Sequence, residues 1–451
     1  MAEPWVSLLI GGTLLLIGFG ASLVFNRYRI PDFIVLLILG VVLARVPFEP
    51  FGPGLVPSLQ PILPVFTNLT IAFILFEGGL SLNLKGSGRE MPGVMGHILV
   101  SVFLTVLITW FVSTWVLGLD DVTGLVIAGA FCGPSGAVVL SFAPGLKLGA
   151  RAHRAVVLDA VITNVIAVII VFYAIRSASL DGTSYVLPYT AQVLLASAFA
   201  GIAGLVWRFV TRRWASLKFL YVATLALAIV IYALANGFIG ENGAVAAFVF
   251  GLVLAYRRPD APPAEKSLSD GLQTFQSEIT FGMRTFFFVY LGLLMTFDQA
   301  TLYGLIGGLL LTLGFVAARA PSSLVLGRLA GMTHRETRVL LGTIARGMTD
   351  VVLVLLAIEG GVIPVSAQPL VVGLVTMTVL VATIVCAAFV VWADRSTKEP
   401  REEAAEPAPE VPSPEEERGT DGVDRSGGPA APPPKAVPRP PPRQKGDPPR
   451  R

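Results

Sequence analysis

Residues 128–142 read AGAFCGPSGAVVLSF, and residues 340–356 read LLGTIARGMTDVVLVLL. Each stretch is an apolar segment that is interrupted near its middle. Proline and glycine remove or free backbone hydrogen-bonding groups, which at membrane depth is tolerated only where these groups line a cavity or are paired again. The breaks contain Gly133, Pro134, Ser135 and Gly136 in the first stretch, and Arg346, Gly347, Thr349 and Asp350 in the second.

Two interrupted helices in corresponding halves of a chain indicate the midplane binding site of a secondary transporter. A pair of ordinary kinks is the alternative interpretation. A kink would explain Pro134, but it would not explain the charges of Arg346 and Asp350, because charged side chains inside a membrane are costly and are usually functional or paired. We therefore favour a polar transport site at the two breaks.

The composition supports a membrane protein. The 451 residues are 54% hydrophobic and 14% charged, whereas soluble chains carry about 25% charged residues. The net charge of +3 gives no support for nucleic-acid binding. Two cysteines and three widely separated histidines form no disulfide or metal-binding pattern. No nucleophile or cofactor motif is recognisable, so we expect neither an enzyme nor a bound cofactor.

Thirteen segments are long and apolar enough to cross a bilayer, which requires roughly 20 residues per helix. The predicted spans are 5–25, 31–48, 61–84, 94–118, 121–143, 153–176, 186–210, 217–236, 239–256, 276–297, 301–325, 336–358 and 367–393. The first has no basic region or cleavage site and is expected to be a helix rather than a signal peptide. The fold class predicted for residues 1–393 is therefore an all-α polytopic membrane protein.

Basic residues fall in every second predicted loop, which by the positive-inside rule places the N-terminus outside and the C-terminus in the cytoplasm. These residues are Arg27, Arg29, Lys85, Arg89, Lys147, Arg151, Arg154, Arg212, Arg213, Lys218, Arg257, Arg258, Lys266, Arg328, Arg335 and Arg338. Residues 394–451 are rich in proline and charge, so they are predicted to form a disordered cytoplasmic tail.

Several polar side chains lie at predicted membrane depth. The ionisable ones are Glu77, Asp159, Glu241, Glu278, Arg284, Arg319, Arg346 and Asp350. Glu241 and Glu278 are near predicted helix ends, where they can reach water, and the others require partners. Asp159 also lies close to Thr163 and Asn164 in the otherwise aliphatic stretch LDAVITNVIAVII, residues 158–170.

Six blocks in order resemble the monovalent cation:proton antiporter superfamily, specifically its NhaP-like sodium/proton exchanger branch. They are ILFEGGLSLNLK, GAFCGPSGAVVLSF, VLDAVITNVIAVII, SEITFGMRTFFFVYLGLL, ARAPSS and ARGMTDVV, within residues 74–352. The resemblance implies inverted repeats with two crossing broken helices. It also implies a core of helices 4–6 and 11–13 that moves like an elevator against a scaffold of helices 1–3 and 8–10. A homodimer in the cell membrane is expected on the same ground.

The sequence departs from this family at the binding motifs. The family commonly carries Thr-Asp-Pro on its fifth helix and Glu-Ser-x-x-Asn-Asp on its sixth. Ser135 takes the threonine position here, and Gly136 takes the aspartate position. Asp159, Thr163 and Asn164 take the positions of the glutamate, the asparagine and the essential aspartate. The usual carboxylate is thus replaced by an amide, which can coordinate a cation through oxygen but cannot exchange a proton.

The resemblance implies an ion pair between Asp159 and Arg319 that holds the core together. The proton carrier is then either Asp159, if this pair opens, or Asp350 on the second crossing helix. Asp350 could instead only neutralise Arg346 one helical turn earlier. The sequence does not distinguish these three interpretations.

Three further family elements are expected to have supporting roles. We expect Glu278 and Arg284 to make polar contacts between core and scaffold. Glu77 is expected on the cytoplasmic access path or in a pair with a basic loop residue.

The function expected from these residues is exchange of Na⁺ or K⁺ for H⁺, with Ser135, Thr163 and Asn164 as oxygen ligands. With one of two core acids bound to arginine, electroneutral one-for-one exchange is expected. Two alternatives belong to other classes. The chain could be a sensor or regulatory relative that transports nothing, or a channel or uniporter that has lost its coupling to protons.

Overall fold

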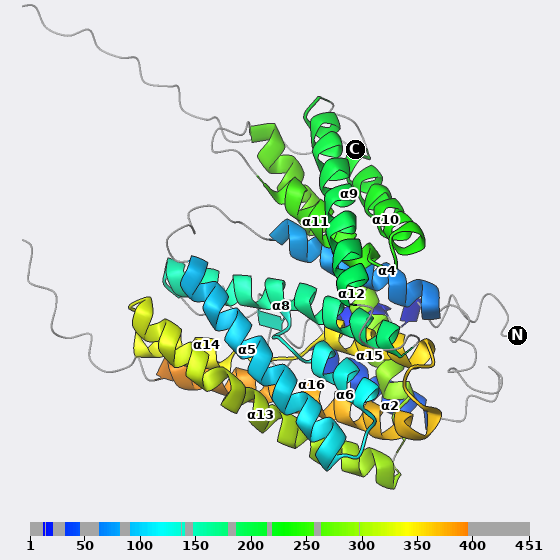
Figure 1. The fold of residues 1–451 in the computed structure, drawn as a ribbon, viewed down its shortest axis with the longest axis vertical. Coiled ribbons are helices and arrows are strands. Elements are labelled where there is room, and N and C mark those ends of the chain that lie inside the picture. Colours follow the sequence, from blue (N-terminus) through cyan, green and yellow to red (C-terminus); the bar gives the residue numbers. More distant parts are fainter. Residues whose placement is uncertain are drawn as a thin grey trace, which may run out of the picture. The chain divides into compact units, whose positions relative to one another are not determined.

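The computed structural model of the protein describes residues 12–13, 15–20, 32–45, 63–81, 91–136, 138–139, 148–178, 186–213, 219–256, 263–296 and 298–395. Within these residues the regular structure is entirely helical (Figure 1), which confirms the predicted all-α membrane fold. Most of the predicted first span, the tail after Arg395, and the loops containing Arg27, Lys85, Lys147 and Arg257 lie outside the described residues. Residues 1–399 form one compact unit, and residues 400–451 are assigned to another.

The helices follow the predicted spans from the second to the thirteenth. They are α2 (Asp32–Leu43), α4 (Leu63–Ser81), α5 (Met91–Phe111), α6 (Asp121–Ala130), α8 (Ala150–Ser177), α9 (Val186–Arg213), α10 (Leu220–Phe238), α11 (Gly243–Ala255), α12 (Pro263–Leu293), α13 (Gln299–Leu329), α14 (His334–Gly342), α15 (Met348–Glu359) and α16 (Gln368–Arg395), with a π-helical turn η2 (Val112–Val116) and a 3₁₀ turn η5 (Val365–Ala367). Among the described residues, six helices are long and apolar enough to cross a membrane.

Two helix boundaries differ clearly from the prediction. Helix α12 begins at Pro263 rather than near residue 276, because proline suits the first turn of a helix, where its missing N–H has no partner to lose. The span predicted as 94–118 ends in the π-helical turn η2 instead of continuing as an α-helix. Gly118 then adopts a left-handed conformation with φ of 71°, and Asp120 caps α6 by accepting the Thr123 N–H at 3.0 Å.

The helices pack in two groups around the interrupted segments. In the first group, α5 packs against α6 and α8, α13 packs against α5, α14 and α16, and α15 packs against α6 and α8 (Figure 1). In the second group, α11 packs against α4, α9 and α10, and α12 packs against α2 and α4. The two groups meet where α15 and α8 contact α4. This contact between the two groups adjoins the second break, because α15 begins directly after it.

The close crossing of α4 and α11 depends on glycine. A Cβ atom at Gly79 would overlap the backbone of α11, and one at Gly251 would overlap the backbone of α4. Small residues at such positions allow helices in a membrane to approach closely enough for backbone packing. This crossing positions α4 for its contact with α15.

Asp298, which caps α13, is expected to give a pH-dependent contribution to stability. The Thr301 backbone N–H that it accepts at 2.7 Å lowers the pKa of this exposed carboxyl below its ordinary value of 3.8. A lowered pKa means that the stabilisation is complete above the ordinary value and is lost as pH falls through the folded value. Asp298→Ala should therefore lower the unfolding temperature by about 2 °C at neutral pH.

The measurement is thermal unfolding of the purified protein in detergent at neutral pH and below pH 4. The difference between Asp298→Ala and the wild-type protein should shrink in acid. An equal difference at both pH values would show that the carboxylate charge has no part in capping α13.

Candidate functional site

The first break interrupts the helix that begins with α6. The Phe131 N–H still donates to the Ile127 carbonyl at 3.0 Å, but regular α6 ends at Ala130. Pro134 has no N–H to donate, and the Ser135 N–H donates across the site to the Ala345 carbonyl at 2.8 Å. The chain is helical again at Gly136. The freed backbone groups of one break are thus partly satisfied by the other break.

The second break separates α14 from α15. The Arg346 side chain lies in this break, only 1% exposed, and its guanidinium donates to the Gly133 carbonyl. The same guanidinium lies over the Phe315 ring, 3.9 Å from its centre. A buried cation of the second break thus donates to a backbone carbonyl of the first break. No pattern in the sequence predicts this contact.

Asp350 lies in the first turn of α15 and is only 2% exposed. Its Oδ2 atom accepts the Gly347 backbone N–H at 2.6 Å, so the carboxylate caps the helix to which it belongs. Arg346 precedes the start of α15, so it does not share a helix face with Asp350, but the charges of the two side chains still act on each other. The interpretation in which Asp350 neutralises Arg346 therefore stays open. The structure shows no N–O contact within 4 Å between these two described side chains.

Helix α8 presents Thr163 and Asn164 to the first break. A Cβ at Gly133 would overlap the Thr163 side chain, and a Cβ at Gly136 would lie 3.6 Å from Asn164 Nδ2. The Thr163 hydroxyl donates to the Asp159 carbonyl at 2.7 Å, which leaves its oxygen lone pairs available. The Asn164 amide is partly buried, and no hydrogen bond from it occurs within the described residues.

Ser135 connects the two breaks. Its side chain lies so close to Gly347 that a Cβ on this glycine would overlap it. Gly347 is also the residue whose N–H binds Asp350. The structure therefore brings Ser135 and Asp350 to the same glycine, while Thr163 and Asn164 lie beside Gly133 and Gly136 of the first break.

The two glycines of the first break should differ in their tolerance of a methyl group. Gly133→Ala would force Cβ into the buried Thr163 side chain, whereas Gly136→Ala would make only ordinary contacts at 3.6 Å and beyond. Overpacking of this kind typically costs about 1–3 kcal/mol. Thermal unfolding in detergent should show Gly133→Ala clearly destabilised and Gly136→Ala close to wild type. Equal unfolding temperatures for the two variants would contradict the close packing of α8 on the break.

Asp159 and Arg319 form an ion pair between α8 and α13. Both side chains are buried, Asp159 at 0% and Arg319 at 2% exposure. Arg319 Nη2 also donates to Thr343 Oγ1 at 3.1 Å and to the Leu340 carbonyl at 3.3 Å. This guanidinium thus joins α8 and α13 to the residues around the end of α14.

His97 is a residue of the site that the sequence did not predict. It lies in α5, is only 3% exposed, and its Nε2 atom is 3.8 Å from Asp159 Oδ2. Neither ring nitrogen has a hydrogen-bond partner among the described residues. Its spacing from Asp159 along the chain carries no signal, because the two residues belong to different helices. The only available signal was a histidine within an apolar segment.

The remaining predicted residues lie away from the breaks. Glu77 accepts a hydrogen bond from Thr280 of α12 at 2.7 Å, and the charge of Arg284 acts on Glu77. Glu278 is exposed on α12. Glu77 and Arg284 thus belong to the contact between α4 and α12, which lies within the second helix group. Glu241 pairs with Arg176 at 2.9 Å, and both side chains are partly exposed.

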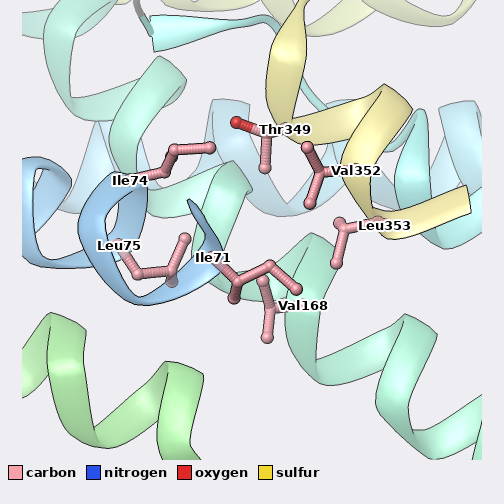
Figure 2. Close-up of a pocket in the computed structure, with 7 residues that line it drawn as sticks. All are labelled: Ile71, Ile74, Leu75, Val168, Thr349, Val352 and Leu353. Atoms are coloured by element: carbon pink, nitrogen blue, oxygen red, sulfur yellow. The ribbon is translucent and has the colours of Figure 1, made fainter. Parts of the chain in front are cut away.

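A small apolar pocket lies where α4 meets α8 and α15. Figure 2 shows Ile71, Ile74 and Leu75 of α4 on one side of this pocket. The other lining residues are Val168 of α8 and Thr349, Val352 and Leu353 of α15. Thr349 precedes Asp350 in the chain, so the pocket adjoins the site and separates it from α4 with aliphatic side chains.

The site combines two buried carboxylates, two buried guanidinium groups and several hydroxyl and amide oxygens that could bind a cation. Hydroxyl, amide and carboxylate oxygens suit hard cations such as alkali ions. Among the described residues no group of histidine, cysteine and acidic side chains could hold a resident metal ion. The arrangement is suited to a small monovalent cation or a proton that enters and leaves.

Two broken helices that contact each other inside a polytopic helical protein are typical of a secondary membrane transporter. The sodium/hydrogen exchanger transmembrane family matches residues 12–392. The chain belongs to this family. It is a transporter of the cation:proton antiporter type, not an enzyme.

Two solved structures with the same fold are a structure at pH 8 and an electron-microscopy map of the sodium proton antiporter MjNhaP1 from Methanocaldococcus jannaschii. The first is 19% identical, with a TM-score of 0.69, and the match covers 86% of this chain and 98% of that chain. The second is 18% identical, with a TM-score of 0.68, and the match covers 88% of this chain and 99% of that chain.

Proposed function

We propose that this protein exchanges Na⁺ for H⁺ across the membrane, with K⁺ as the alternative cation. The observation that carries this proposal is the meeting of the two breaks beside Asp350, the residue whose carboxylate accepts the Gly347 N–H. A buried carboxylate can hold either a proton or an alkali cation. When one site binds the two in competition, transport of one is coupled to transport of the other.

The oxygen ligands in this proposal are Ser135, Thr163 and Asn164, together with Asp350. Asn164 contributes only its amide oxygen, so the proton must reside elsewhere. Asp159 is bound to Arg319 in a buried pair and therefore serves mainly to hold α8 against α13. Asp350 is the carboxylate at the breaks without a direct guanidinium contact among the described residues. We assign the exchangeable proton to Asp350.

The charge balance supports electroneutral exchange. Asp159 and Asp350 balance Arg319 and Arg346 when all four are ionised. A proton on Asp350 adds one positive charge, and a bound alkali cation adds the same charge. One cation therefore replaces one proton without changing the net charge of the site.

We further propose that the group containing α5, α6, α8 and α13–α16 moves as a core against a scaffold that contains α2, α4 and α10–α12. The contacts of α15 with α4 support this division, because they join the two groups through an apolar surface that can slide. The proposed assembly is a homodimer in the cell membrane with its N-terminus outside. These features fit the exchanger family to which the chain belongs.

The test is reconstitution of the purified protein into proteoliposomes with a trapped pH dye. A gradient of Na⁺ or K⁺ should drive an opposite movement of protons, and this movement should persist when the membrane potential is clamped. Cation flux without a pH change would instead identify an uncoupled channel or uniporter. The absence of any flux at all pH values would favour the sensor alternative, which is motivated by Asn164 in place of the usual acid.

A further inference from the structure

Glu359 is an acidic residue at the opposite end of α15 from Asp350. Its Oε1 atom accepts a hydrogen bond from the Thr67 hydroxyl of α4 at 3.1 Å. Its Oε2 atom is buried and has no hydrogen-bond partner among the described residues. Glu359 thus offers an unsatisfied carboxylate oxygen at the contact between the two helix groups, and the transport site at the breaks does not use it.

The same contact extends from Glu359 to the breaks. Helix α4 carries Thr67 near one end of the contact, followed by Ile71, Ile74 and Leu75. Helix α15 runs in the opposite sense, with Glu359 beside Thr67 and with Thr349, Val352 and Leu353 around the apolar pocket (Figure 2). Along the α4–α15 interface, the Glu359 carboxylate is followed by the aliphatic residues of the pocket and then by Thr349, which precedes Asp350 in the chain.

The spacing along α15 separates the two carboxylates by most of the helix. Asp350 and Glu359 are nine residues apart, which corresponds to about 13 Å at 1.5 Å per residue. One ion cannot contact both at once. The aliphatic residues of the pocket lie between them and offer a cation no polar ligand, apart from the Thr349 hydroxyl.

The chemistry of the Glu359 end favours a cation. Thr67 of α4 adds a hydroxyl oxygen beside Glu359, and this oxygen keeps its lone pairs because the hydroxyl donates its hydrogen to Glu359 Oε1 at 3.1 Å. No lysine or arginine within the described residues forms a salt bridge with Glu359. Carboxylate and hydroxyl oxygens are ligands that suit a hard monovalent ion.

We propose that Glu359 is an entry site that binds the transported alkali cation at one end of the α4–α15 interface, before the ion reaches the site at the breaks. This inference rests on the proposed exchange function. The pocket residues of α4 and α15 act as the apolar seal between the entry site and Asp350. The basic-poor loop after α15 places this entry on the outer side of the membrane.

The test compares the KM for external Na⁺ with the maximal rate of exchange in right-side-out vesicles. Glu359→Gln should raise KM roughly tenfold, because the entry charge is lost, while the maximal rate stays within about twofold. Thr67→Val removes the hydrogen bond but keeps the carboxylate, so its KM should change by about twofold or less. Asp121→Asn, which removes an exposed acid at the start of α6, is the matched control and should leave both values unchanged.

Two results would overturn the entry site. One is a KM for Glu359→Gln that equals the KM of Asp121→Asn. The other is an equal fall in maximal rate for Glu359→Gln and Thr67→Val, which would identify the pair as a structural contact between the helix groups.

Binding of radioactive Na⁺ to the purified protein separates this inference from the exchange proposal. Weaker binding in Glu359→Gln than in Asp121→Asn supports the entry site even if the wild-type protein moves no protons. Exchange in the wild-type protein together with equal Na⁺ binding in both variants would refute the entry site and leave the exchange function intact.

Discussion

Asp350→Asn is expected to reduce cation-driven proton exchange at least about 100-fold, the scale typical of removing an essential proton-transfer group. The substitution should preserve the fold, because the asparagine oxygen can still accept the Gly347 N–H that Asp350 binds at 2.6 Å. What disappears is the ability to hold a proton and to balance a cation with a full negative charge. The initial rate of dye response in proteoliposomes under a Na⁺ gradient measures this loss.

The matched control for this experiment is Asp121→Asn, which removes one exposed carboxylate at the start of α6. It should exchange at the wild-type rate. Unchanged exchange in Asp350→Asn would eliminate Asp350 as the proton carrier. The next candidate would be Asp159 together with His97, whose Nε2 atom is 3.8 Å from Asp159 Oδ2. Na⁺ flux that continues in Asp350→Asn without proton movement would show that this carboxylate couples the two ions without being needed for cation passage.

Asp159→Ala and Arg319→Met are each expected to destabilise the protein by about 3–5 kcal/mol, because either change leaves a buried charge without its partner. The cost should be greater for Asp159→Ala. This variant leaves Arg319 at 2% exposure, with neutral oxygens as its remaining partners. Thermal unfolding in detergent, followed by the loss of the monodisperse species in size-exclusion chromatography, measures both variants.

The decisive comparison is between the double variant Asp159→Leu with Arg319→Met and the two matched single variants, Asp159→Leu and Arg319→Met. Replacing a buried ion pair with apolar residues of similar volume is often neutral or stabilising, so the double variant should be more stable than either single variant. If its destabilisation equals the sum of the two single effects, the two side chains do not interact energetically. The ion pair would then have no part in holding α8 against α13.

The fold was predictable to a large extent because it depends on local composition. Apolar segments of bilayer length predicted helices such as α8 and α16, and both agree with the predicted spans within a few residues. The breaks were predictable for the same reason, since Pro134 and Gly347 act on the backbone where they stand. The start of α12 was missed because residues 263–275 are too polar for a span, although they remain helical.

The site was only partly predictable. The pairing of Asp159 with Arg319 could be expected only from the family resemblance, and the structure brings these side chains together. The sequence did not predict the partners of Arg346. Its guanidinium donates to the Gly133 carbonyl and lies over the Phe315 ring, and both residues belong to other segments of the chain. His97 and Glu359 gave no signal in sequence, since each acquires its significance from a residue on another helix.

The sequence by itself determined a helical membrane protein with two interrupted spans, because hydrophobic length and the chemistry of proline and glycine act locally. The tertiary structure alone decided which partner each buried charge has. Arg346 reaches across to Gly133, Asp350 turns back to Gly347, and Glu359 meets Thr67. Away from water, a charge is stabilised by whatever groups the fold places within a few ångströms of it, and such contacts join helices that are far apart in the chain.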